Sequence, residues 1–129
     1  MLKKTVNYTD YNGVEQQDTY YFNFNKVELV ELGLSGNDLA KQIQEVSNIE
    51  DNYELFKLIR DIVLKSYGEK SEDGKRFVKS EALRRNFEQS EAYSELLFAL
   101  CSNSDDLAAF INGIVPQNID QSTTKSVPN

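Results

Sequence analysis

The stretch from Asp51 to Gly68, DNYELFKLIRDIVLKSYG, constrains the fold most, because its apolar residues recur at helical spacing. These apolar residues are Leu55, Leu58, Ile59, Ile62 and Val63, with Phe56, Leu64 and Tyr67 on either side. A stripe this broad must be covered from more than one direction. Asp51 is the expected N-cap, with Glu54 in capping-box position, and Gly68 is the expected left-handed stop. The sequence therefore predicts a central helix that other elements surround.

Residues 2 to 24 alternate between apolar and polar in two runs separated by DYNG, which is typical of a β-hairpin. A two-residue Asn-Gly turn would pair Tyr11 with Val14 and put the two apolar sets on opposite faces. A type I turn that starts at Asp10, with Gly13 left-handed, pairs Asp10 with Val14 and gathers the apolar side chains on one face. That face holds Leu2, Val6, Tyr8, Tyr20, Phe22 and Phe24, while Thr5, Asn7, Thr19, Tyr21 and Asn23 face water.

The rest of the chain predicts a mainly helical body. The expected helix starts are Asn25 (with Glu28 reciprocal and Gly33 closing), Ser35 or Asn37 (with Leu39, Ile43 and Val46 buried), Ser80, Ser90 and Ser104, the last helix ending at Asn112-Gly113. The polar run EKSEDGKR is a loop or a small hairpin before Phe77 and Val78. We therefore expect an α+β fold in a single domain over residues 1–116. In it a hairpin (2–24) packs on a body of five to six helices (25–116), and a disordered tail (117–129) follows.

The chain contains no histidine. Histidine is the usual general base and the usual transition-metal ligand, so its absence excludes the Ser/His/Asp and Cys/His catalytic arrangements. The glycines are scattered and form no phosphate-binding loop. The acidic residues occupy helix starts and loops, where they have ordinary structural roles. We therefore expect a protein that is not an enzyme and has no metal site and no cofactor.

A net charge of -7 argues against nucleic acid as a partner, because phosphate binding needs clustered Lys and Arg. No apolar run approaches the roughly 20 residues that span a bilayer, so neither a membrane segment nor a signal peptide is expected. The single cysteine, Cys101, shares a helical stripe with Tyr93, Leu97 and Leu100 and is predicted to be a buried small hydrophobe. This cysteine usage is typical of a reducing cytoplasm.

Two sets of residues are candidates for binding a partner. The cationic region comprises Lys70, Lys75, Arg76, Lys79, Arg84 and Arg85. It is either a solvated face or a dock for an acidic partner segment, which an opposite-sign patch would steer into place. Tyr11 and Tyr21 are the aromatic residues that the strand pattern places outside, and tyrosines are enriched at contact surfaces.

Three segments resemble the small tail assembly chaperones of long-tailed bacteriophages that infect Gram-positive hosts. They are KKTVNYTDYNGVEQQDTYYFNFNKVELVEL, LKSYGEKSEDGKRFVKS and FEQSEAYSELLFALCSNSDDLAAFINGIVP, which cover most of Leu2 to Pro116. The resemblance implies a non-enzymatic factor that coats the tape measure protein, keeps it soluble and recruits tail tube subunits in the host cytoplasm. It also implies absence from the finished virion and, commonly, a second form extended by a translational frameshift. The broad apolar helical surface adds the expectation of a homo-oligomer.

Other classes of protein remain as alternatives. The main one is a structural head-tail or tail accessory subunit that stays in the virion. An acidic mimic of DNA is a weaker alternative, because Lys57, Arg60 and Lys65 interrupt the acidic residues of the central helix. An enzyme ranks last.

Overall fold

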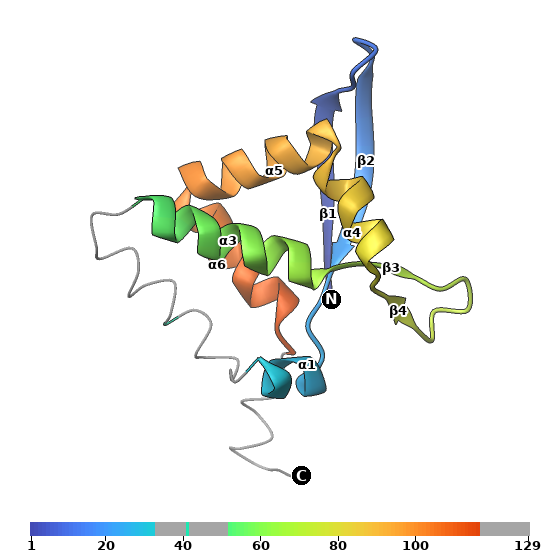
Figure 1. Cartoon of the computed structure of the whole chain (residues 1–129), viewed down its shortest axis with the longest axis vertical. Coiled ribbons are helices and arrows are strands. Elements are labelled where there is room, and N and C mark those ends of the chain that lie inside the picture. The colour runs from blue at the N-terminus through green and yellow to red at the C-terminus, as the bar shows by residue number, and fades with distance from the viewer. Residues whose placement is uncertain (33–40, 42–51, 117–129) are drawn as a thin grey trace.

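The computed structural model describes residues 1–32, Lys41 and 52–116. The strands are β1 (Leu2–Thr9), β2 (Glu15–Phe22), β3 (Tyr67–Lys70) and β4 (Phe77–Val78), and the helices are α1 (Lys26–Glu31), α3 (Asn52–Ser66), α4 (Glu81–Glu88), α5 (Glu91–Ser102) and α6 (Ser104–Ile114). The strands form one antiparallel sheet in the order β1-β2-β3-β4. Figure 1 shows α3, α5 and α6 together on one side of the β1–β2 hairpin. The predicted α+β fold is confirmed.

The N-terminal hairpin has the predicted register and turn. Strands β1 and β2 pair with Leu2 opposite Phe22 and Tyr8 opposite Gln16. The backbone N–H of Asp10 donates to the carbonyl of Val14 at 2.8 Å, and Gly13 is left-handed with a φ of 81°. Even-numbered residues of both strands therefore share the face that packs on the helices.

A third and a fourth strand extend this hairpin, and the sequence did not indicate that they join its sheet. Helix α3 ends at Ser66, and Gly68 lies in β3, where it pairs with Tyr21. The prediction that Gly68 ends the helix in a left-handed conformation is therefore wrong. A Cβ atom at Gly68 would lie 2.7 Å from the ring of Phe77 and 2.8 Å from the carbonyl oxygen of Val78. Glycine is needed there because β4 approaches closely.

The polar EKSEDGKR run forms the end of β3 and the connection of a small hairpin, one of the two structures expected for it. Strand β3 pairs with β4 through Glu69 with Val78 and Lys70 with Phe77. Gly74 is left-handed in the connecting turn, with a φ of 74°.

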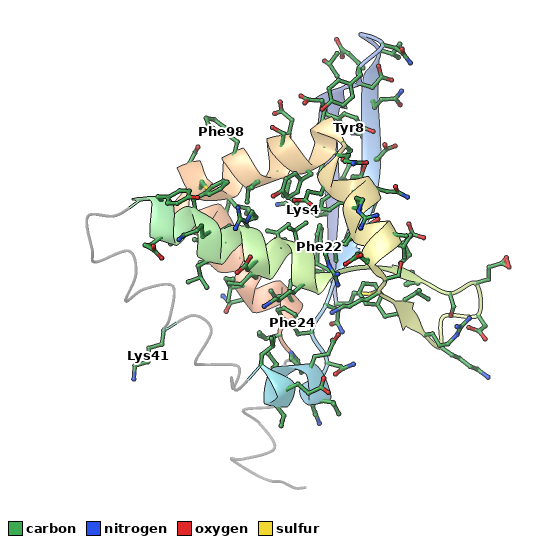
Figure 2. All side chains as sticks on the ribbon, in the orientation of Figure 1. Lys4, Tyr8, Phe22, Phe24, Lys41 and Phe98 are labelled. Carbon is green, nitrogen blue, oxygen red and sulfur yellow. The ribbon has the colours of Figure 1, made fainter. Side chains whose placement is uncertain are left out.

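The hydrophobic core lies between the even-numbered face of the sheet and the helices. Phe22 is fully buried at its centre, with the rings of Phe87 and Phe110 edge-on at 5.8 and 5.1 Å. Figure 2 shows Phe22 facing the helices from β2. Helix α3 contributes the buried residues Ile59 and Val63 from its predicted stripe. Burying apolar side chains from the sheet and from the helices is what holds the two layers together.

Three of the predicted helix starts are confirmed. Asn25 and Glu28 form a reciprocal capping box at the start of α1. The side chain of Ser80 accepts from the backbone N–H of Leu83, and Ser90 caps α5 in the same way.

The boundaries of α6 differ from the prediction. Asn103, rather than Ser104, caps the helix, because its amide oxygen accepts from the N–H groups of Asp105 and Asp106. The predicted stop at Asn112-Gly113 is also wrong. The helix continues to Ile114, which is fully buried. Packing of this residue in the core outweighs the local helix-stop signal.

Several predictions lie outside the described residues. They are the closing role of Gly33, the helix opened by Ser35 or Asn37 with Leu39, Ile43 and Val46, the cap at Asp51, and the tail at 117–129.

Candidate partner-binding surface

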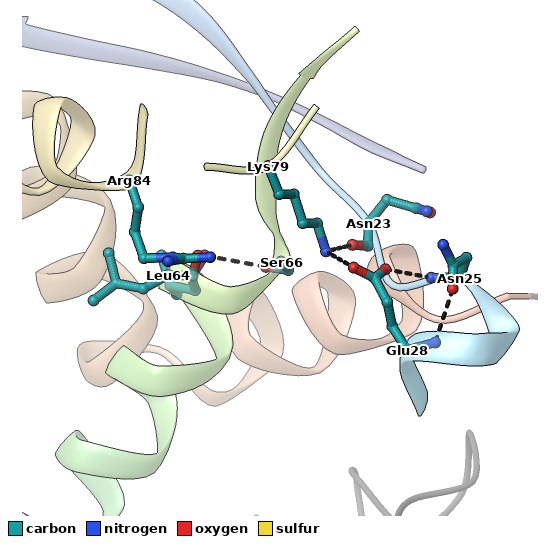
Figure 3. A network of polar contacts seen from close by, with 8 residues as sticks. Asn23, Asn25, Glu28, Leu64, Ser66, Lys79 and Arg84 are labelled. Carbon is teal, nitrogen blue, oxygen red and sulfur yellow. Dashed lines mark hydrogen bonds and ion pairs between the residues drawn. The ribbon is translucent and has the colours of Figure 1, made fainter. Parts of the chain in front are cut away.

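The cationic region predicted from the sequence does not form one free surface. Lys79 is largely buried, and its ammonium group donates to Glu28 Oε2 at 2.8 Å and to the carbonyl of Asn23 at 2.7 Å (Figure 3). Burial lowers the pKa of Lys79 against the opposing effect of Glu28. Arg84 Nε donates to the carbonyl of Leu64 near the end of α3. Lys79 and Arg84 therefore join elements of the fold.

The other cations of this region lie on α4 and on the β3–β4 hairpin. Arg85 pairs with Glu81 one turn earlier in α4, at 3.0 Å, and both side chains are exposed. Lys75 and Arg76 are exposed in the β3–β4 connection. Lys70 lies over the ring of Tyr21, at 4.7 Å from its centroid. The sequence identified the charges but could not show which of them are engaged in contacts within the fold.

The two predicted contact tyrosines lie at opposite ends of the hairpin. Tyr11, in the turn, is 76% exposed, and its hydroxyl donates to Glu91 Oε1. This hydrogen bond raises the pKa of Tyr11. Tyr21 is half-buried beside β3 rather than exposed. Tyr21 therefore lies on the face predicted for it but is less exposed than expected, because β3 pairs beside it.

A groove between α3 and α5 is the most apolar candidate surface, and the sequence did not predict it. It encloses about 280 Å³ and is lined by Phe56, Tyr93, Ser94, Leu97, Phe98 and Cys101. Phe98 is 75% exposed, and Figure 2 shows it projecting from α5. Tyr53, 63% exposed, stacks on Phe56 at the α3 side. We call these residues, with Tyr53, the α3–α5 groove.

Cations border the α3 side of this groove. Lys57 Nζ lies 4.8 Å from the ring centroid of Tyr53, and the Arg60 guanidinium lies 5.8 Å from that of Phe56. Each cation also has an acidic neighbour on α3, Glu54 for Lys57 and Asp61 for Arg60. The two rings therefore contact each other and cations of the same helix.

Cys101 lies at the edge of the groove and is exposed, so the prediction of a buried cysteine is wrong. Partial burial against the groove raises the pKa of its thiol. The predicted stripe is real, and its member Leu97 is buried in the core as expected, but Cys101 at the end of the stripe lies exposed at the groove. The sequence contained one signal for this groove, the run ELLFALC. Its apolar residues cover most of the circumference of a helix, which is wider than the single stripe that faces a core.

A second apolar set lies on α1. Val27, Val30 and Leu32 are 65%, 74% and 38% exposed. They lie on or next to one helix of six residues, whereas the α3–α5 groove is built from two longer helices, so we place the candidate site in the groove.

The described residues give no sign of a metal or membrane site. Among them, no three His, Cys, Asp or Glu side chains come together as metal ligands. Nor is any described helix long and apolar enough to cross a bilayer.

Comparison with curated proteins and with solved structures gives no significant match. The family model described as phage tail assembly chaperone matches residues 1–129, which is the whole chain. The chain therefore belongs to the phage tail assembly chaperone family.

Proposed function

We propose that this tail assembly chaperone binds the tape measure protein of its phage, keeps it soluble and recruits tail tube subunits during tail morphogenesis. The proposal extends the family assignment to specific partners. It places the work in the host cell cytoplasm, with the chaperone lost before the virion is complete, and it involves no catalysis.

The observation that supports this proposal is the exposed apolar surface of the α3–α5 groove. Phe98 is 75% exposed on a helix whose other large apolar residues, such as Leu96 and Leu97, are buried. Exposed apolar patches on soluble proteins mark sites where another protein binds. An amphipathic helix can lay its apolar face into such a groove, with single side chains entering the hollow. A helical, aggregation-prone client such as the tape measure protein suits this mode of binding.

The test is co-expression with the tape measure protein of the same phage, followed by pull-down and light scattering of the eluted complex. We expect a soluble complex with several copies of the chaperone. Phe98→Ser should reduce the recovered tape measure protein at least about fivefold, since it removes an anchor worth about 1 to 3 kcal/mol. Val30→Ser is the matched control, because Val30 is 74% exposed but lies on α1. Equal recovery with both variants would refute binding through the groove.

A structural subunit retained in the virion is the competing function. Mass spectrometry of purified particles separates the two, because a chaperone is absent and a structural subunit is present in stoichiometric amounts. Addition of tail tube protein to the purified complex tests recruitment. No retention of tube protein on the complex would remove that part of the proposal.

A further inference from the structure

Strand β2 has an open edge over most of its length. It runs from Glu15 to Phe22, but β3 pairs only with Tyr21 and Phe22. Beyond Gly68, β3 turns away to pair with β4. Figure 1 shows the tip of the β1–β2 hairpin projecting past the helices while β3 and β4 diverge from it. Among the described residues, no strand covers this side of β2 from position 15 to 20.

Two hydrogen bonds identify the backbone groups that face this edge. Asp10 N–H donates to the Val14 carbonyl, so this even-numbered pair is hydrogen-bonded. Hydrogen-bonded and non-bonded pairs alternate along an antiparallel ladder, so the even-numbered residues of β2 point their N–H and C=O groups toward β1. On the other side, Asn23 N–H donates to the Ser66 carbonyl, so odd-numbered residues of β2 face β3. The N–H and C=O groups of Glu15, Gln17 and Thr19 therefore point out of the open edge.

The space beside this edge is hollow. About 310 Å³ is enclosed by Thr19, Tyr20, Tyr21, Tyr67, Gly68, Glu69 and Lys70. The hollow begins where β3 leaves β2, so an added strand would continue the sheet there. Adding a strand to an exposed edge is a recurrent mode of protein association.

We propose that this edge pairs with the same edge of a second copy of the chain, antiparallel and around a two-fold axis at Gln17. Glu15 of each copy then lies opposite Thr19 of the other, and the two Gln17 residues face each other. In this register, the outward N–H and C=O groups of Glu15, Gln17 and Thr19 all form hydrogen bonds with the other copy. The product is a continuous sheet in the order β1-β2-β2-β1 across the two copies. This inference concerns self-association and does not depend on which client the α3–α5 groove binds.

The distribution of charge favours a second copy in this orientation. The tip of the hairpin, residues 10–18, carries Asp10, Glu15 and Asp18 and no Lys or Arg. At the other end of the open edge, Lys70 lies 4.7 Å from the ring centroid of Tyr21. Glu15 and Tyr21 are both odd-numbered, so their side chains lie on the same face of β2. In the antiparallel register, the Glu15 carboxylate of one copy therefore lies on the same face of the sheet as Lys70 of the other. A parallel pairing would instead place the acidic tips side by side, which like charges oppose.

The hairpin tip also supplies apolar contacts for this arrangement. Tyr11 and Val14 are 76% and 52% exposed at the tip. Antiparallel pairing brings the tip of each copy toward the tyrosine-lined hollow of the other. The interface is therefore the same surface used twice, as a two-fold dimer requires.

Sedimentation velocity over a range of concentrations tests the proposal on the full chain. Because the interface is small, we expect a reversible dimer with a Kd on the order of 100 μM. Gln17→Pro removes an outward N–H and should weaken the dimer about tenfold or more. Asn7→Pro is the matched control, since Asn7 lies directly opposite Gln17 and its N–H faces the outer edge of β1. Circular dichroism checks that both variants fold.

A charge exchange gives a second, independent test. Glu15→Lys and Lys70→Glu should each weaken the homodimer about fivefold or more, because each creates two like-charge contacts across the interface. A mixture of the two variants should form a dimer at least as tight as wild type, because both contacts are then of opposite charge. A chain that stays monomeric at about 1 mM would overturn the proposal and leave the edge to an extended segment of another protein. A dimer that ignores all these variants would overturn it too.

Discussion

Lys79 and Glu28 are 51 residues apart in the chain, and their charged groups meet at 2.8 Å where α1 joins the sheet. The two oxygens of Glu28 have separate partners, Oε2 the ammonium of Lys79 and Oε1 the backbone N–H of Asn25. One carboxylate therefore both caps α1 and fastens it to the segment after β4 (Figure 3).

Replacing Lys79 with Met should lower the free energy of unfolding by about 1 to 3 kcal/mol, because it leaves Glu28 without its cation. The effect is moderate because the Glu28 side chain is 27% exposed. Denaturation by urea measures it. Glu28→Gln in the same chain should recover part of the loss, since an amide needs no counter-charge. Arg85→Met, which breaks an exposed pair with Glu81, should cost less than about 0.5 kcal/mol. Equal losses at positions 79 and 85 would contradict this account.

Gly68→Ala should destabilise the fold by about 2 to 4 kcal/mol. The new methyl group would lie 2.8 Å from the backbone oxygen of Val78, which can move only if β4 moves. Thermal unfolding followed by circular dichroism measures the change. Gly113→Ala is the comparison, because there the new methyl group meets the flexible end of Leu2 at 2.7 Å, and alanine favours the helix. We expect the free energy of unfolding to change by less than about 1 kcal/mol for Gly113→Ala. A larger loss for Gly113→Ala than for Gly68→Ala would contradict the proposed clash with Val78.

Local patterns predicted most of the fold correctly because local physics sets those features. The register of the hairpin followed from the parity of Asp10 and Val14, and the caps at Asn25, Ser80 and Ser90 followed from side chains that reach the first free N–H groups. Residues 33–40 and 42–51 lie outside the described part of the chain, so the helix predicted there stays a prediction.

The errors occur where distant segments meet. Gly68 resembles a helix stop in sequence, and only the approach of Phe77 shows why glycine is there. The direction in which the α5 stripe faces depends on how α5 lies against α3, so the sequence could not show that Phe98 and Cys101 border a groove. For the same reason, the sequence could not show that Lys79, a member of the predicted cationic region, is held in an ion pair with Glu28.

Stability should fall in alkaline solution as Tyr67 ionises. Burial raises the pKa of Tyr67 from 10.0 to about 12. The folded state therefore favours the neutral phenol, and the resulting stability is complete below pH 10 and is lost as the pH rises from 10 to 12. We expect Tyr67 to account for about 2 kcal/mol of the loss. Urea denaturation at pH 8 and pH 11.5 should show a smaller difference for Tyr67→Phe than for wild type. An equal difference would mean that Tyr67 titrates as an ordinary tyrosine.

The α3–α5 groove can be tested through Cys101, the single cysteine of the chain. The thiol is exposed, so a chromogenic disulfide reagent should label it in the free protein. The labelling rate should increase with pH into the alkaline range, because burial against the groove raises the thiol pKa and only the thiolate reacts. Binding of the tape measure protein should slow labelling at least about tenfold, since an occupied groove covers its edge. With the same client present, Phe98→Ser should label as fast as the free protein, whereas Val30→Ser should remain protected. Unchanged labelling in a complex of confirmed composition would place the client on a different surface and would leave Phe98 exposed for another partner.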